Sequence, residues 1–124
     1  QRLVFHPFPA QAADLDLVEL HDCFATAELL HYDNLMLCDH GEAGRFIDER
    51  HPWRDGSLPV NVSGGLLSKG HPVAATGIAG IYEIATHLRD EAGARQIQGA
   101  NVGLAHVLGL GSSCGVHILE RRRS

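Results

Sequence analysis

The stretch from Asn61 to Gly77 reads NVSGGLLSKGHPVAATG and carries the strongest structural signal in this chain of 124 residues. Gly70 permits a backbone conformation with positive φ, and Pro72 suits the first position of a helix because its φ is already restricted. From Ile78 to Leu88, apolar residues recur every three to four positions. This spacing predicts a helix with one buried face that ends near residues 89–90.

His71 is therefore expected at about the N-cap of this helix. The positive end of the helix dipole disfavours a charged imidazole there, so the ring should stay neutral and donate one N–H toward developing negative charge. The pattern is also typical of a histidine in an ordinary glycine-rich turn. From the residues alone that interpretation has the larger weight, because catalysis requires a partner that this stretch does not supply.

Strand-like and helix-like segments alternate along the rest of the chain. The predicted strands span residues 15–20, 58–62, 100–108 and 114–119, and the last two form a hairpin. Asp22 is placed to cap a helix that ends near Cys38. Together with the helix after Pro72, this order predicts an α/β fold in which a mixed sheet is layered with helices.

Apolar side chains in two segments are expected to form much of the core. The helix after Asp22 contributes Phe24, Ala27 and Leu30, followed by Leu35, Met36 and Leu37. The hairpin contributes Leu104, Val107, Val116, Ile118 and Leu119. Both sets have the spacing of elements that bury apolar side chains.

The chain is predicted to form one domain from residue 14 to residue 120. Residues 1–13 contain two prolines and little periodicity, and they are expected to form an irregular N-terminal segment. Residues 39–57 are charged and rich in turn-forming residues, which indicates an exposed loop. Residues 121–124 are expected to be a solvated basic tail.

The composition is typical of a soluble globular protein, with 44% hydrophobic and 20% charged residues. The formal net charge of -5 argues against a nucleic-acid groove. No apolar run approaches the roughly 20 residues needed to cross a bilayer and no signal peptide is recognised, so we expect no membrane insertion and a cytoplasmic location. Cys23, Cys38 and Cys114 are odd in number and lack zinc-ligand spacing, so we expect free thiols and no metal site.

Three motifs resemble the thiolases. Residues 61–77 resemble the thiolase signature Asn-x-x-Gly-Gly-x-x-x-x-Gly-His-Pro-x-Gly-x-Thr-Gly, and residues 19–24 (ELHDCF) resemble the His-Asp-Cys-Phe motif of the sterol-carrier-protein type of 3-oxoacyl-CoA thiolase. Residues 109–111 (GLG) stand where most thiolases carry Cys-x-Gly and the sterol-carrier type carries Gly-x-Gly. The resemblance spans residues 14–120 and implies the C-terminal half of a thiolase subunit. Residues 1–13 are too short to supply the first strand and helix of such a half.

This resemblance implies an acyl-CoA acyltransferase, such as an acetyl-CoA acetyltransferase, that makes or cleaves 3-oxoacyl-CoA in lipid metabolism, for example in fatty acid β-oxidation. The acyl group passes through a cysteine thioester, which divides one difficult Claisen step into two easier ones. That nucleophile belongs to the N-terminal half, so the isolated chain is expected to be inactive. The implied partners are acyl-CoA, the missing half and further copies in a dimer or tetramer. Coenzyme A enters as part of the substrate, and no separate cofactor is implied.

The resemblance also implies roles for the motif residues. Gly109 replaces the cysteine that removes the α-proton of acetyl-CoA in common thiolases, and the sterol-carrier type assigns that duty to the cysteine here numbered Cys23. His21 and His71 hold the thioester oxygen while the adjacent carbanion forms, and the backbone N–H of Gly111 contributes to a second oxyanion hole. Without the motif, a lone cysteine in an apolar setting is more often a core residue.

Three further motif residues are implied to line the substrate site. Phe24 is expected near the pantetheine arm, although a phenylalanine at a helix start is more often part of the core. Gly70 and Asn61 belong to the signature itself. One position departs from the family, because Ala74 stands where the signature has glycine. In a helical turn this alanine is harmless to the helix, so the departure concerns the substrate geometry more than the fold.

Two alternative functions remain open from the sequence. One is a thiolase-like subunit that catalyses retro-aldol cleavage, or that serves as a non-catalytic scaffold for acyl-CoA or lipid with a partner protein. The other is an α/β domain without activity. Thiolase-like retro-aldolases generally alter the Gly-His-Pro site, whereas residues 70–72 are intact here. We therefore favour acyl transfer.

Overall fold

The computed structural model describes residues 11–109 and 113–122. Its sheet contains β1 (Leu17–Glu19), β2 (Val102–Gly109) and β3 (Ser113–Glu120), in the order β1-β2-β3. The first two strands are parallel and the last two are antiparallel. The predicted mixed sheet and C-terminal hairpin are therefore confirmed.

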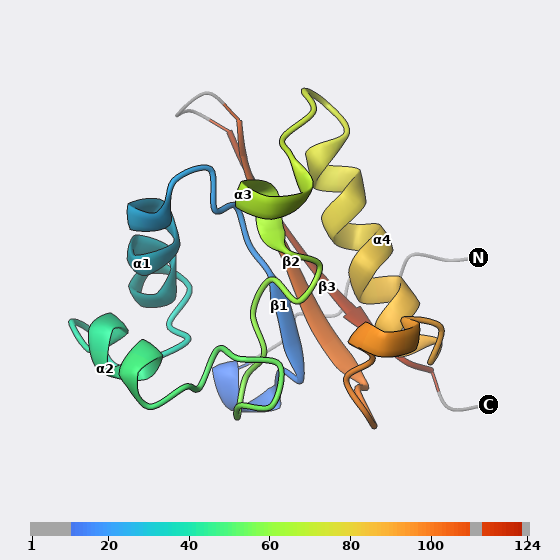
Figure 1. The fold of residues 1–124 in the computed structure, drawn as a ribbon, viewed down its shortest axis with the longest axis horizontal. Helices are drawn as coiled ribbons and strands as arrows, with labels where there is room; N and C mark the ends of the chain where they lie inside the picture. Colours follow the sequence, from blue (N-terminus) through green and yellow to red (C-terminus); the bar gives the residue numbers. More distant parts are fainter. Residues whose placement is uncertain (1–10, 110–112, 123–124) are drawn as a thin grey trace.

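Helices cover both faces of this sheet (Figure 1). They are α1 (Ala25–Asn34), α2 (Ala43–Asp48), α3 (Gly65–Lys69) and α4 (Thr76–Leu88), with short 3-10 turns η1 (Ala12–Asp14) and η2 (Gly93–Arg95). In Figure 1, α1 and α2 lie on one side of the strands and α4 lies on the other. The predicted layered α/β architecture is confirmed.

Two hydrophobic clusters correspond to the two faces of the sheet. Leu17 packs with Ile84 of α4, whereas its neighbour Val18 packs with Tyr32 of α1 and Phe46 of α2. Successive side chains of a strand point to opposite faces, so adjacent residues of β1 enter different clusters. Both Leu17 and Val18 are fully buried, which places β1 in the interior.

The predicted strand 58–62 is reduced to one parallel bridge between Val18 and Val60. The backbone N–H of Asn61 still donates to the carbonyl of Val18 at 2.8 Å. Asn61 has φ 51°, however, and such a conformation ends an extended segment. The segment therefore runs beside β1 without forming a regular strand.

The helix predicted to begin at Pro72, with His71 at about its N-cap, begins four residues later, at Thr76. Ala74 has φ 65°, a left-handed conformation that cannot belong to a right-handed helix. His71 is therefore not the N-cap, and Pro72 does not occupy the first helical position. Ala74 is exposed, so its methyl group does not crowd a neighbouring strand.

The first helix also differs from its prediction. Asp22 does not cap it, because the N-cap is Phe24 and no side chain caps the helix there. The carboxylate of Asp22 instead accepts the backbone N–H of Leu66 at 2.7 Å. The helix ends at Asn34 rather than near Cys38, and Met36 at φ 53° prevents its continuation.

Several apolar residues predicted to be in the core are exposed. On the helix segment the side chains that face inward are His31 and Tyr32. The exposed residues are Phe24 at 71%, Leu30 at 63%, Met36 at 77%, Val116 at 48% and Ile118 at 37%. Leu104 and Leu37 are buried as predicted. The chain thus presents apolar side chains of α1 and β3 at its surface.

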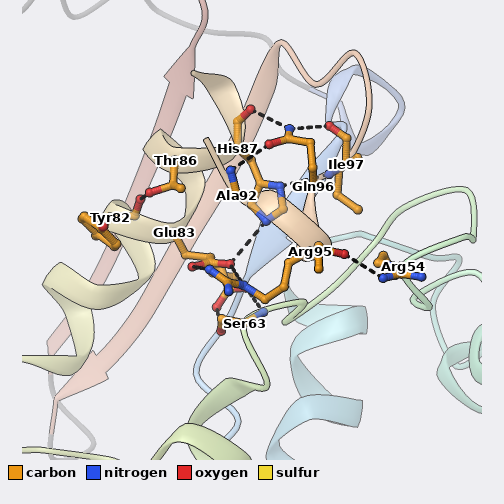
Figure 2. Close-up of polar contacts among 12 residues, drawn as sticks. Arg54, Ser63, Tyr82, Glu83, Thr86, His87, Ala92, Arg95, Gln96 and Ile97 are labelled. Atoms are coloured by element: carbon orange, nitrogen blue, oxygen red, sulfur yellow. Dashed lines mark hydrogen bonds and ion pairs between the residues drawn. The ribbon is translucent and has the colours of Figure 1, made fainter. Parts of the chain in front are cut away.

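Figure 2 shows the polar contacts that hold the C-terminal end of α4. Arg95 donates to both carboxylate oxygens of the buried Glu83, at 2.8 and 3.2 Å. Burial alone would raise the pKa of Glu83, but these bonds and the charge of Arg95 lower it. The fully buried His87 accepts the backbone N–H of Ile97 through Nδ1 at 3.1 Å, and burial lowers its pKa. These contacts connect α4 to the segment that leads into β2.

The segment predicted as an exposed loop, residues 39–57, contains α2, and Phe46 of that helix is buried against Tyr32. Among residues 11–109 and 113–122, no helix is both long enough and apolar enough to span a membrane.

Candidate active site

Two histidines that are distant in the sequence meet beside the end of β1. His21 follows β1 and is 5% exposed, and its ring centroid lies 4.9 Å from that of His71, with the ring planes at 81°. His71 lies in the exposed loop between α3 and α4. Burial lowers the pKa of His21, and the neighbouring His71 lowers it further. The structure therefore brings His21 and His71 together, with His21 neutral near pH 7.

The first residue of α4 determines which nitrogen of His71 faces outward. Nδ1 of His71 lies 2.8 Å from the hydroxyl oxygen of Thr76, and that hydroxyl donates to the carbonyl of Pro72 at 3.0 Å. A hydroxyl has one proton, so Thr76 accepts from His71 and Nδ1 carries hydrogen. When the His71 ring is neutral, its other nitrogen, Nε2, carries no hydrogen and can accept a proton. After protonation, Nε2 becomes a donor.

Two more histidines, absent from the predicted site, lie behind His21. The backbone N–H of His21 donates to Nδ1 of His106 on β2 at 3.4 Å. The ring of His106 packs against that of His31 on α1, with centroids 4.6 Å apart. Burial lowers the pKa of His106 to about 4 and also lowers that of His31. Both rings are therefore neutral near pH 7, and Nδ1 of His106 accepts the hydrogen bond from His21.

The alternation of side chains along β2 could have indicated that His106 is buried. His106 follows the predicted core residue Leu104 by two positions, and residues two apart on a strand share a face. The sequence motifs selected neither His106 nor His31 as a site residue. They did not predict that the two rings meet.

Cys23 lies two residues before the start of α1 and is half-buried. The three cysteines are free thiols. Cys38 donates to a carboxylate oxygen of Asp33 at 3.6 Å, and Cys114 is exposed on β3. Of the three, Cys23 is nearest in the chain to His21.

The remaining predicted site residues occupy different environments. Gly70 ends α3 with φ 95°, a conformation that strains any residue with a side chain. The side-chain oxygen of Asn61 accepts the backbone N–H of Leu20 at 2.8 Å, which anchors the end of β1. The amide nitrogen of Asn61 is buried and finds no partner within the described residues. Phe24 is largely exposed, and Gly111 lies outside the described residues.

The start of α3 fits against the same segment of chain. Gly65 has φ 59°, and a Cβ at that position would overlap the carboxylate of Asp22. This close approach lets Asp22 reach the backbone N–H of Leu66. In the part of the chain that the structure describes, no group of three or more His, Cys, Asp or Glu side chains is arranged to hold a metal ion.

The mixed sheet and the paired histidines at its edge define a layered α/β domain with a histidine-based site. Residues 9–121 match the model of the family described as thiolase C-terminal domain-like, and the chain belongs to this family. The resemblance drawn from the three motifs is confirmed.

Individual relatives agree with this assignment. The chain is 50% identical over 101 residues to "Sterol carrier protein 2" of Rattus norvegicus, covering 82% of this chain and 18% of the relative. It is 46% identical over 109 residues to "Acetyl-CoA acetyltransferase" of Methanothermobacter thermautotrophicus, covering 87% of this chain and 28% of the relative. The chain therefore spans less than a third of these relatives.

A solved structure titled "Ltp2-ChsH2(DUF35) aldolase" superimposes with a TM-score of 0.80, at 24% identity, over 93% of this chain and 29% of that one. At this identity the likeness shows the fold alone.

Proposed function

We propose that this chain is the C-terminal catalytic half of an acyl-CoA acyltransferase that makes or cleaves 3-oxoacyl-CoA by Claisen chemistry. The nucleophilic cysteine comes from an N-terminal half that this sequence does not include. The complete protein acts in the cytoplasm on lipid-derived thioesters and assembles as a dimer or tetramer. The observation that carries the proposal is the contact between the rings of His21 and His71.

In this proposal the two imidazoles face the oxygen of the acetyl-CoA thioester. Loss of the α-proton places negative charge on that oxygen, and two fixed donors stabilise it most when they are oriented before the reaction. His71 uses Nε2, because Nδ1 is held by Thr76. The ring can accept the proton of the nucleophilic thiol and then donate as an imidazolium. His21 is held neutral by burial and supplies the second N–H.

Cys23 is proposed as the base that removes the α-proton. It lies two residues before the N-terminal end of α1 and two residues after His21. The carbanion then attacks the acyl group on the nucleophilic cysteine, a carbon–carbon bond forms, and the cysteine leaves as a thiolate. The backbone N–H of Gly111 is proposed to stabilise the oxygen of that acyl group. Phe24, Gly70 and Asn61 are proposed to contact the substrate.

The names of the relatives support acyl transfer. One of them is named as an acetyl-CoA acetyltransferase, and 46% identity over most of this chain is high enough to suggest related chemistry. A retro-aldolase is the second candidate, as the sequence left it open; the superimposed structure carries that title but shares only the fold at 24% identity. A non-catalytic scaffold for acyl-CoA or lipid is the third. The intact Gly-His-Pro sequence at residues 70–72 favours acyl transfer over both.

The test uses the complete protein that contains this chain. Incubated with acetyl-CoA in D₂O, it should exchange the α-protons of the acetyl group, and Cys23→Ala should abolish this exchange. Cys114→Ala, which changes an exposed thiol of β3, is the matched control and should retain it. Unchanged exchange in Cys23→Ala would remove Cys23 from the mechanism. Cleavage of a 3-hydroxyacyl-CoA without any exchange would favour the aldolase.

A further inference from the structure

A buried carboxylate connects the two segments that carry the paired histidines. Glu19, the last residue of β1, is 3% exposed. Its Oε1 accepts the backbone N–H of Ser63 at 3.1 Å, and its Oε2 accepts the hydroxyl of Ser63 at 2.5 Å. Lys69 donates to the same Oε2 at 3.2 Å and to the hydroxyl oxygen of Ser63 at 2.7 Å. We call these three residues the Glu19 cluster.

The Glu19 cluster lies close along the chain to both histidines. Glu19 precedes His21 by two residues, and Lys69 precedes His71 by two residues. Ser63 lies two residues before the short helix α3 and Lys69 is its last residue, so both ends of that helix are attached to one carboxylate. The side chain of Lys69 retains only 26% exposure, which shields the ion pair from solvent.

His71 needs such an attachment. It lies between Gly70, at φ 95°, and a loop that becomes helical only at Thr76. Glycine gives the backbone more freedom than any other residue, so the local sequence does not hold the ring in one place. The bond to Thr76 orients the imidazole from one side, and the Glu19 cluster fixes the chain on the other side.

We infer that Glu19, Ser63 and Lys69 are positioning residues that set the spacing between the His21 and His71 rings, and that Lys69 acts through Glu19 rather than on the substrate. This inference rests on the proposed function. A displacement of about 1 Å in a catalytic group can reduce a rate on the order of 10²-fold. Loss of the ion pair should therefore lower kcat and leave KM nearly unchanged.

The chain supplies a matched control for the ion pair. Glu83 and Arg95 also join a buried carboxylate to a partly exposed cation, at 2.8 Å (Figure 2). They hold the C-terminal end of α4, whereas His71 precedes the N-terminal end of that helix. Arg95 donates to Glu83 and not to Glu19, so Arg95→Met should lower the stability and leave the bonds of the Glu19 cluster in place.

The experiment measures kcat and KM for thiolytic cleavage of 3-oxoacyl-CoA, and the melting temperature, in the complete protein. Lys69→Met should lower kcat on the order of 10²-fold with little change in KM, and Lys69→Arg should recover most of it. Arg95→Met should lower the melting temperature with kcat close to that of the wild type. Equal effects of Lys69→Met and Arg95→Met on kcat would overturn the inference. A higher KM with normal kcat would do the same, because it would place Lys69 on the substrate.

A second readout does not depend on activity. In a crystal structure of the Lys69→Met protein, the His21 and His71 rings should have moved apart from their separation of 4.9 Å. Rings that keep this separation would overturn the inference, whether or not the wild type is active as a thiolase. An inactive wild type would instead overturn the proposed function. If Lys69→Met does not fold, Ser63→Ala takes its place in both measurements. It should lower kcat and displace the two rings. A Ser63→Ala protein with normal kcat and unmoved rings would overturn the inference.

Discussion

Acid should destabilise this domain through His106, and the effect can be isolated by one substitution. His106 is 7% exposed, and burial lowers its pKa to about 4, with a further contribution from the neighbouring His31 and His21. In the unfolded chain a histidine has its ordinary pKa, near 6.5. Between about pH 4 and pH 6.5, the unfolded state therefore binds a proton at His106 that the folded state does not bind.

The sign and size of the effect follow from this difference. Stability from the neutral ring is fully present above pH 6.5 and is lost as the pH falls toward 4. One pH unit corresponds to about 1.4 kcal/mol, so the complete loss from His106 is on the order of 3 kcal/mol. A domain with about 5–15 kcal/mol of total stability should respond clearly to such a loss.

The substitution is His106→Asn. The asparagine side-chain oxygen can accept the backbone N–H of His21 in place of Nδ1, while the titrating group is removed. The assay is urea unfolding of the chain at several pH values between 7 and 4.5, followed by circular dichroism. The variant should lose less stability over this range than the wild type, by about 2 kcal/mol.

His117→Asn, which changes an exposed histidine of β3, is the matched control and should leave the pH dependence as it is in the wild type. The reasoning would be refuted if His106→Asn and the wild type lost the same free energy of unfolding between pH 7 and pH 4.5. A histidine NMR titration that places the pKa of His106 near its ordinary value would refute it independently.

Three further substitutions test separate features. Ala74→Gly should raise the stability by up to about 1 kcal/mol in thermal unfolding, because glycine adopts φ 65° without a steric penalty; a lower melting temperature would contradict this. Gly65→Ala should destabilise the chain by about 1–3 kcal/mol in urea, since the new methyl group displaces the Asp22 carboxylate from α3; wild-type stability would show that α3 can shift freely. Thr76→Val should reduce kcat of the complete protein by about 10- to 100-fold, because Nδ1 of His71 loses its acceptor, and an unchanged kcat would show that the bond does not orient the ring.

The period of the apolar residues predicted the elements that have one buried face, but for α1 it did not predict which side chains are buried. The hairpin and most of α4 were located because their apolar residues recur with the period of the element. In α1, Leu30 follows the same period but is 63% exposed, while Tyr32 is buried at 1%. Apolar residues are common on surfaces, so an apolar position does not reveal which face meets the sheet.

The motifs singled out His21 and His71, whereas nothing in the sequence singled out the contacts of the Glu19 cluster. His21 and His71 were selected from motifs, and the structure brings their rings together. The supports depend on contacts between segments distant in the chain, such as Glu19 with Lys69. No spacing rule links such residues, because their proximity results from hydrogen bonds between separate segments rather than from the period of any one element.

The conformation of Ala74 changes the physical account of His71. Sequence reasoning placed His71 at a helix end and attributed its neutral state to the helix dipole. The dipole effect falls off within the first turn, and α4 begins at Thr76, after the left-handed Ala74. The protonation of Nδ1 is therefore set by the hydroxyl of Thr76 instead. A glycine at this position of the family signature fits the left-handed conformation that Ala74 adopts here, and the hydroxyl of Thr76 orients the ring of His71 from the first residue of α4.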